Sequence, residues 1–287
     1  MILSDLRILS RANEQSQYSG LDCLEHCLDK THFNSYPYKI NYHYNSRGFR
    51  DQEWPTDLTD LKSSIWCIGD SFTSGLGSPI EHIWPAILSQ KTNIRTINIS
   101  LDGASNNWIA RQACTILENI DPVLVVIQWS YSHRRELALD TLVDAIWQEF
   151  YSNIRDPGWP DCNSYRNLYL LPETIQTEIN QHSWLHGYDL DTMRKISHSK
   201  TTIEEDVLNT QNCIDQVCKY STKNVIHSFI PNWHCAPTEL NFHSARLIKF
   251  NQIDFARDGH HYDIKTADYF VDQVLETLNL PTSTVLV

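Results

Sequence analysis

The stretch Ile65-Trp66-Cys67-Ile68-Gly69-Asp70-Ser71-Phe72-Thr73-Ser74-Gly75 decides how the chain is interpreted. A short apolar run that ends in glycine and polar residues is typical of a buried strand followed by a turn. Three more apolar runs of this kind follow along the chain, at 94–99, 123–129 and 225–230. Each ends in polar or turn-forming residues, so the sequence predicts four buried strands.

Segments with helical spacing lie between these strands. In one of them the apolar residues share one helix face: Trp108, Ile109, Ala113, Ile116, Leu117 and Ile120. A similar spacing extends over 137–147, and further helices are expected at about 204–220 and 264–278. Alternating strands and helices predict an α/β fold, with a mostly parallel sheet covered by helices on both faces. Such folds bind their ligands at the carboxyl ends of the strands.

The chain is expected to form one elaborated α/β domain at 61–287, preceded by an N-terminal extension at 1–60 that packs on the core. Alternating residues at 38–44 suit a half-exposed strand within this extension. Residues 156–203 are rich in Pro, Asn, Trp and Tyr and interrupt the strand–helix pattern. We expect them to form an insertion over one end of the domain.

Composition limits the function classes. With 287 residues, of which 41% are hydrophobic, the chain can fill a core. A net charge of −12 without a dense basic run excludes nucleic acid as a partner. No apolar run approaches the roughly 20 residues that span a bilayer, and the first residues lack the apolar stretch of a signal peptide. We therefore expect no membrane insertion and a cytoplasmic location, where the eight cysteines are reduced thiols.

Ser71 falls at the carboxyl end of the first predicted strand, where sites of this architecture form. A nucleophile is one interpretation, and a helix cap in a glycine-rich turn is the other. The loop has no lysine for a phosphate-binding P-loop, lacks the third glycine of a dinucleotide fingerprint, and carries Thr73 where a GxSxG elbow needs glycine. This segment alone does not decide whether Ser71 is a nucleophile or part of a helix cap.

A second candidate segment precedes the last predicted helix and contains Asp258 and His261. An Asp three residues before a His can place both side chains on one side of a turn, so that the carboxylate orients the imidazole. His260 is an alternative base. The other interpretation of this segment is an exposed turn in which neither histidine has a catalytic role. Because a serine hydroxyl needs a base at neutral pH, Ser71 and this segment together suggest nucleophilic catalysis.

These blocks resemble those of the SGNH (GDSL) hydrolase family: Gly69-Asp70-Ser71 after a strand, and Asp258-x-x-His261 before the C-terminal helix. Between them, Asn98-Ile99-Ser100-Leu101-Asp102-Gly103 is similar to the family's second block. The segment Asn45-Ser46-Arg47-Gly48-Phe49-Arg50 resembles one that precedes the catalytic domain in some members. The resemblance implies a three-layer α/β/α sandwich with a flavodoxin-like sheet. It also implies catalysis by Ser71, His261 and Asp258, an oxyanion hole that includes the Ser71 and Gly103 amides, and no metal or organic cofactor.

One block departs from the family pattern. After the third strand the family has Gly-x-Asn-Asp, whose Asn side chain donates to the oxyanion, whereas this chain has Ser130-Tyr131-Ser132-His133. By position Ser132 replaces that Asn, and Asn106 or Asn107 are alternative donors. Losing one oxyanion donor costs on the order of a hundredfold in turnover, about 3 kcal/mol.

The resemblance implies a serine esterase that cleaves a carboxylic ester through an acyl-serine intermediate. Resembling enzymes act on lipids, simple esters and acetylated sugars, and we favour a short-acyl ester of a carbohydrate as the substrate. Aromatic residues of the insertion could stack on a sugar: Trp159, Tyr165, Trp184 and Tyr188. Two alternatives stay open, a weakly active or inactive module that binds a glycan or a protein, and an O-acyltransferase. The oligomeric state is not indicated.

Overall fold

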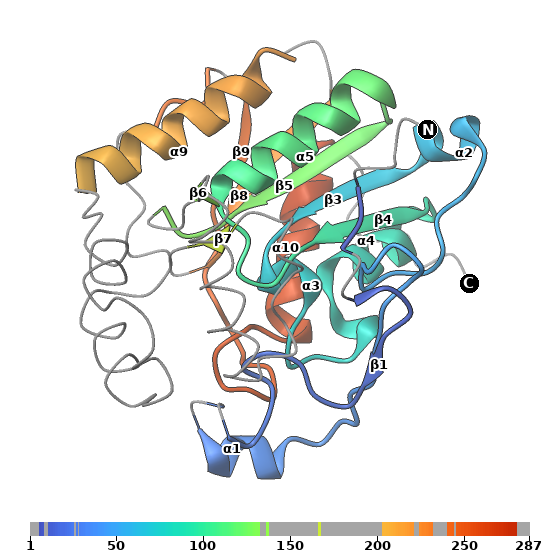
Figure 1. The fold of residues 1–287 in the computed structure, drawn as a ribbon, viewed down its shortest axis with the longest axis vertical. Coiled ribbons are helices and arrows are strands. Elements are labelled where there is room, and N and C mark those ends of the chain that lie inside the picture. Colours follow the sequence, from blue (N-terminus) through green and yellow to red (C-terminus); the bar gives the residue numbers. More distant parts are fainter. Residues whose placement is uncertain are drawn as a thin grey trace, which may run out of the picture.

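A computed structural model of the chain describes residues 6–8, 11–25, 27, 29–132, 136–137, 166–167, 203–220, 224–231, 240–243 and 245–279. Its centre is a five-stranded sheet whose neighbouring strands all pair in parallel (Figure 1). The strands are β3 (Ile65–Gly69), β4 (Thr96–Ser100), β5 (Leu124–Trp129), β8 (Val225–Phe229) and β9 (Arg246–Ile248). The first four correspond to the four predicted strands.

The strand order is β4-β3-β5-β8-β9. When only these five strands are numbered along the chain, the order is 2-1-3-4-5, which is the flavodoxin-like order. The predicted fold class is therefore confirmed. In this order the first strand, β3, lies between the second and third, so the loops after all three strands meet at one edge of the sheet.

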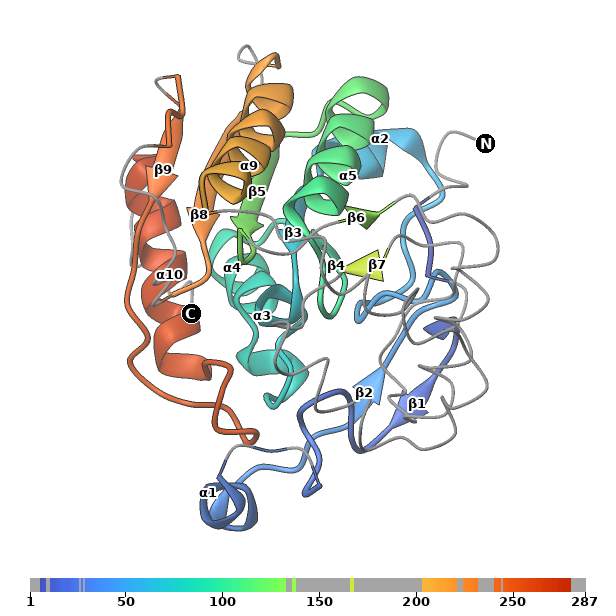
Figure 2. The same cartoon turned by 60° about the vertical axis from the view of Figure 1, so that its left-hand side comes forward.

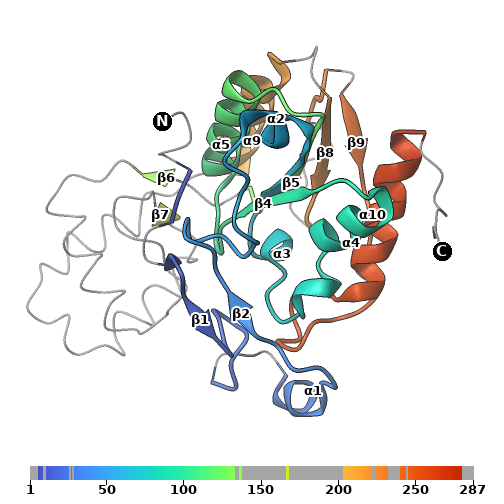
Figure 3. The ribbon, with the colours of Figure 1, turned by 90° about the vertical axis from the view of Figure 1, so that its right-hand side faces the viewer.

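Helices cover both faces of the sheet, which gives the three predicted layers. On one face α5 (Asn106–Asn119) packs beside α9 (Ile203–Cys218), and on the other α4 (Trp84–Thr92) packs beside α10 (Ile264–Thr277) (Figures 2 and 3). The helices predicted at 108–120, 204–220 and 264–278 are thereby confirmed. The core is formed by the sheet and the inner faces of these helices.

One predicted helix begins differently in the structure. Leu137 lies in a short strand, β6 (Glu136–Leu137), which pairs antiparallel with β7 (Arg166–Asn167). Pairing with Arg166 fixes an extended backbone at Leu137, and the apolar spacing could not show this pairing. The remainder of that prediction, at 138–147, lies outside the described residues, as does the proposed insertion at 156–203 apart from β7 and Ile203, the first residue of α9.

The N-terminal part of the chain contains β1 (Gln15–Ser16), α1 (Lys30–Ser35), β2 (Tyr42–His43) and α2 (Leu58–Ser63). Strands β1 and β2 pair antiparallel. Burial alternates as the pattern at 38–44 predicted, because Ile40, Tyr42 and Tyr44 are buried while the residues between them are exposed. Phe49 and Trp54 belong to the same apolar core as the strands of the sheet.

Within the described ranges, no helix has the length and apolar character needed to cross a membrane. The same part of the chain holds no group of three His, Cys, Asp or Glu side chains placed to bind a metal ion. Six of the eight cysteines lie in described segments, and all six are free thiols.

Candidate active site

Ser71 begins a short helix directly after the central strand. The helix α3 (Ser71–Ser74) is capped by Asp70, whose carboxylate accepts a hydrogen bond of 3.0 Å from the amide of Phe72. The helix-cap interpretation of this loop is thus confirmed for Asp70. It does not compete with a role for Ser71, because the cap fixes the turn and leaves the Ser71 side chain at the carboxyl end of β3.

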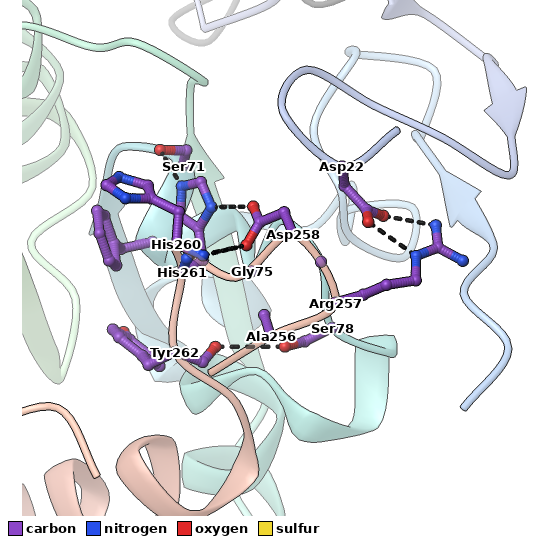
Figure 4. Close-up of polar contacts among 12 residues, drawn as sticks. Asp22, Ser71, Gly75, Ser78, Ala256, Arg257, Asp258, His260, His261 and Tyr262 are labelled. Atoms are coloured by element: carbon purple, nitrogen blue, oxygen red, sulfur yellow. Dashed lines mark hydrogen bonds and ion pairs between the residues drawn. The ribbon is translucent and has the colours of Figure 1, made fainter. Parts of the chain in front are cut away.

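The structure brings Ser71, His261 and Asp258 together in one hydrogen-bonded row (Figure 4). Nε2 of His261 lies 2.8 Å from Oγ of Ser71, and Nδ1 of His261 donates to Oδ2 of Asp258. The imidazole of His261, and not that of His260, meets the serine. All three side chains are buried, with Ser71 and His261 2% exposed and Asp258 0% exposed. This row has the connectivity of nucleophile, base and orienting acid.

The second carboxylate oxygen of Asp258 is also held in place. Oδ1 accepts hydrogen bonds from the backbone amides of His260 and His261, at 2.9 and 3.0 Å. Asp258 is therefore hydrogen-bonded both to the imidazole of His261 and to the backbone of the turn that carries it. Neither oxygen of this fully buried carboxylate lacks a donor.

The electrostatics of the pair favour a charged imidazole beside a charged carboxylate. Burial acts to raise the pKa of Asp258, but the His261 charge and the three hydrogen bonds outweigh it and lower that pKa below its usual value. Burial acts to lower the pKa of His261, but Asp258 outweighs it, with Asp102 and Asp70 adding to the effect, so that pKa is raised. His261 can thus accept a proton from Ser71 and hold it.

The loops after β3 and β4 lie side by side. Gly69 is the register partner of Ser100, and the amide of Leu101 donates to the carbonyl of Gly69 at 3.2 Å. Gly103 follows in this loop with φ +74°, a left-handed conformation that glycine adopts without strain. The backbone amides of Ser71 and Gly103 thus belong to neighbouring loops at the carboxyl edge of the sheet.

Two side chains, Asn106 and Asp70, form hydrogen bonds with the loop after β5. The Asn106 amide donates to the Ser130 carbonyl at 3.2 Å and to Oγ1 of Thr210 at 3.3 Å, and its oxygen accepts from the Ser130 amide at 2.8 Å. Oγ of Ser130 donates to Oδ2 of Asp70 at 2.6 Å, which ties this loop to the serine turn. Ser132 lies buried two residues further on. The sequence did not indicate either of these contacts, although Asp70 directly precedes Ser71.

The Asn side chains considered as alternative oxyanion donors are engaged elsewhere. Both amide hydrogens of Asn106 are used by Ser130 and Thr210. Asn107 and Asn209 of α9 pair through their amides in both directions, at 3.0 and 3.1 Å. Asn106 and Asn107 thus each have side-chain partners of their own, and Ser132, which replaces the family's Asn by position, is carried forward as the proposed donor.

Arg50, a buried arginine of the N-terminal part, binds the backbone carbonyls that follow Ser71. Arg50 is 1% exposed and donates to the carbonyls of Ser74, Gly75 and Ser78, with distances of 3.1 Å to Ser74 and 2.7 Å to Ser78. A cation at the carboxyl end of a helix stabilises its unpaired carbonyls. The only sequence signal for this role was the resemblance of the segment that ends in Arg50.

No family model matches the chain, and no curated protein matches it. The solved structures to which it is similar include a Bacteroides fragilis protein provisionally named an acylhydrolase, which is 10% identical with a TM-score of 0.36 over 80% of this chain and 98% of that chain. A provisionally named GDSL-like lipase from Bacteroides ovatus is 13% identical with a TM-score of 0.35, over 78% of this chain and 56% of that chain.

A provisionally named lipolytic protein of the G-D-S-L family, from Desulfitobacterium hafniense, is 17% identical with a TM-score of 0.24, over 57% of this chain and 77% of that chain. The GDSL descriptions name the family that the sequence blocks resemble.

Proposed function

We propose that the chain is a serine esterase that hydrolyses a carboxylic ester through an acyl-serine intermediate. The observation that carries this proposal is the contact of 2.8 Å between Ser71 Oγ and His261 Nε2, in an imidazole whose other nitrogen donates to Asp258. A serine hydroxyl is almost wholly protonated at neutral pH, so it attacks only when a base takes its proton. A buried imidazole with a raised pKa beside a carboxylate is such a base.

In the acylation step, Ser71 Oγ forms a bond to the ester carbonyl carbon while its proton passes to Nε2 of His261. The carbonyl oxygen becomes an oxyanion, which the backbone amides of Ser71 and Gly103 and the Ser132 hydroxyl would stabilise. The tetrahedral carbon then loses the alcohol, as the bond to the leaving oxygen breaks and the histidine returns its proton to that oxygen. An acyl-serine ester remains.

In the deacylation step, water takes the place of the alcohol. His261 removes one proton from the water as its oxygen bonds to the acyl carbon, and a second oxyanion forms. The bond to Ser71 Oγ then breaks and the serine regains a proton from His261, so the acid leaves and the enzyme returns to its starting state. Throughout both steps Asp258 stays ionised and stabilises the imidazolium.

For the substrate we propose a short acyl group, acetyl, on a carbohydrate alcohol. The support for the sugar is a set of aromatic residues at 156–203 that all lie outside the described residues: Trp159, Tyr165, Trp184 and Tyr188. Screening acetylated sugars alongside simple aryl acetates tests this finer part separately from the chemistry. Transfer of the acyl group to a sugar, in preference to water, would instead identify an O-acyltransferase.

The test is hydrolysis of a short-chain aryl acetate by the wild-type protein, Ser71→Ala and His261→Ala. Two matched controls remove the same side-chain types elsewhere: Ser89→Ala in α4, and His243→Ala, an exposed histidine paired with Asp215. We expect Ser71→Ala and His261→Ala to lose turnover and both controls to keep it. Equal inactivity of the wild type and all variants would favour a binding module.

A further inference from the structure

Asp22, in the N-terminal part, is a fully buried carboxylate with three hydrogen bonds. Oδ2 accepts from the Tyr42 hydroxyl at 2.7 Å. Arg257 donates to both oxygens, from Nε at 2.8 Å and from Nη2 at 2.6 Å, as Figure 4 shows. The Asp22 side chain is 0% exposed and that of Arg257 12% exposed. Arg257 directly precedes Asp258, so this ion pair ends one residue from the proposed catalytic acid.

The same contacts continue into the serine loop and close a ring. The backbone amide of Arg257 donates to the carbonyl of Gly77 at 2.8 Å, and the amide of Gly77 donates to the Tyr42 hydroxyl, also at 2.8 Å. Tyr42 in turn donates to Asp22. Burial and the neighbouring Asp22 charge raise the pKa of Tyr42 well above its usual value, which keeps its hydroxyl protonated as the donor. We call these four residues, Asp22, Arg257, Gly77 and Tyr42, the Asp22 ring.

The Asp22 ring joins the two loops that carry the proposed catalytic groups. Gly77 belongs to the loop that begins with Ser71, and Arg257 belongs to the loop with Asp258 and His261. The two loops are so close at Gly77 that an added Cβ would lie 2.9 Å from the Ala256 Cβ and 3.1 Å from the Asp258 nitrogen. Asp22 is thus linked to one loop through Arg257 and to the other through Tyr42.

The arginine of the ring has little freedom to move. Its guanidinium carbon lies 5.2 Å from the Tyr18 ring centre and 4.9 Å from the Phe33 ring centre, and Nη2 also donates to the Gln17 carbonyl at 2.8 Å. Buried ion pairs add little net stability, because the loss of hydration offsets their attraction. What a bidentate Asp–Arg pair does supply is a fixed geometry.

We propose that Asp22 is a positioning residue for the proposed esterase, which sets the distance between Ser71 and His261 through Arg257 and Tyr42. This inference rests on the proposed function but concerns residues outside the nucleophile, base and acid. A misplacement of about 1 Å in a catalytic group can cost on the order of a hundredfold in rate. The carboxylate acts on the transition state through the loops and touches no substrate.

The test uses the full chain with Asp22→Asn and Arg257→Ala, and with Lys91→Ala as control, which removes outer ion pairs to Asp268 and Asp272. For Asp22→Asn we expect kcat on an aryl acetate to fall by about tenfold or more, with KM changed less than about twofold. Lys91→Ala should keep kcat. For Arg257→Ala, millimolar guanidinium chloride should restore turnover by entering the space between Tyr18 and Phe33, and sodium chloride or urea should not.

A readout that does not depend on turnover is the far-downfield proton resonance of His261 Nδ1, which donates to Asp258. We expect Asp22→Asn to broaden this signal or move it upfield, and Lys91→Ala to preserve it. If the wild type proves inactive, the proposed function fails, and this resonance alone decides the positioning role. Unchanged kcat and an unchanged resonance in folded Asp22→Asn would overturn the positioning role. It would also be overturned if the rate of Arg257→Ala fell only in step with a lowered Tm and guanidinium did not restore it.

Discussion

Nε2 of His261 lies 2.8 Å from Oγ of Ser71, although 190 positions separate the two residues in the chain. The parallel sheet explains the meeting, because β3 delivers Ser71 to its carboxyl edge and the loop before α10 returns His261 to the same edge. Asp258 holds the other side of the imidazole.

Asp258→Asn should lower activity and shift its pH dependence. Neutral His261 is the proposed base, so kcat/KM should fall as the pH drops through the raised pKa of His261. Without the Asp258 carboxylate that pKa falls, and the midpoint should move to lower pH. The rate at neutral pH should drop by roughly a thousandfold or more. A pH profile of kcat/KM measures both effects, and an unshifted midpoint would contradict the role of Asp258.

Ser132→Ala should lower kcat by roughly tenfold to a hundredfold with little change in KM, because an oxyanion donor acts on the transition state. Asn107→Ala is the matched comparison, since its amide pairs with Asn209 on α9. Steady-state kinetics of both variants on an aryl acetate make the measurement. Loss of kcat in Asn107→Ala with none in Ser132→Ala would reverse our choice of donor.

Gly77→Ala should destabilise the fold by roughly 1–3 kcal/mol and separate the loop that begins with Ser71 from the loop that carries Asp258 and His261. Gly77 has φ +76° and close contacts to Ala256 and Arg257, so both strain and overlap oppose a side chain. Gly259→Ala is the control, since Gly259 has φ +72° but its nearest atoms lie 3.5 Å or more from an added Cβ. Denaturant unfolding of the two variants separates overlap from strain. Equal losses of stability would argue against a tight contact at Gly77.

Asp51→Asn should change how stability depends on pH. Burial raises the pKa of Asp51 from 3.8 to about 6, against the opposing effect of Arg95. The folded state therefore holds this proton more tightly than the unfolded state, and stability is lost as the pH rises from about 4 to about 6. Two pKa units correspond to about 3 kcal/mol.

The variant lacks this titration, so its free energy of unfolding should gain on that of the wild type by up to that amount between pH 4 and pH 7. Urea unfolding of both proteins across this range checks the prediction. A constant difference between the two curves would show that Asp51 titrates normally.

The central strands and three helices could be predicted because their signals are local. An apolar run such as Leu124–Trp129, buried along its whole length, is visible in any sequence window. Strand β9 was missed because Arg246 is exposed and only Ile248 is buried, as befits an edge strand. Helix α4 was missed because it is only nine residues long and its buried residues Trp84, Pro85, Ile87 and Leu88 all lie in its first five positions, so the apolar spacing does not recur over further turns.

The residues of the candidate site also differ in whether a local sequence pattern marks them. Ser71, Asp258 and His261 were found because each stands in a short segment with its own signal, a serine after a strand and an Asp three residues before a His. Arg50 and Asp22 act across the fold, and Asp22 meets Arg257 over 235 positions of chain. No local pattern marks such partners. The two hydrogen bonds between Asn106 and the Ser130 backbone depend likewise on how two loops meet at the sheet edge.

The most direct test of the central claim is covalent labelling of the folded protein with a fluorophosphonate, followed by peptide mass spectrometry. This reagent reacts with a serine whose hydroxyl is activated by a base, and it requires no knowledge of the substrate. We expect one adduct, at Ser71, that is absent from Ser71→Ala and forms far more slowly in His261→Ala. An unlabelled Ser71 in the folded wild type, or labelling as fast without His261 as with it, would contradict the account.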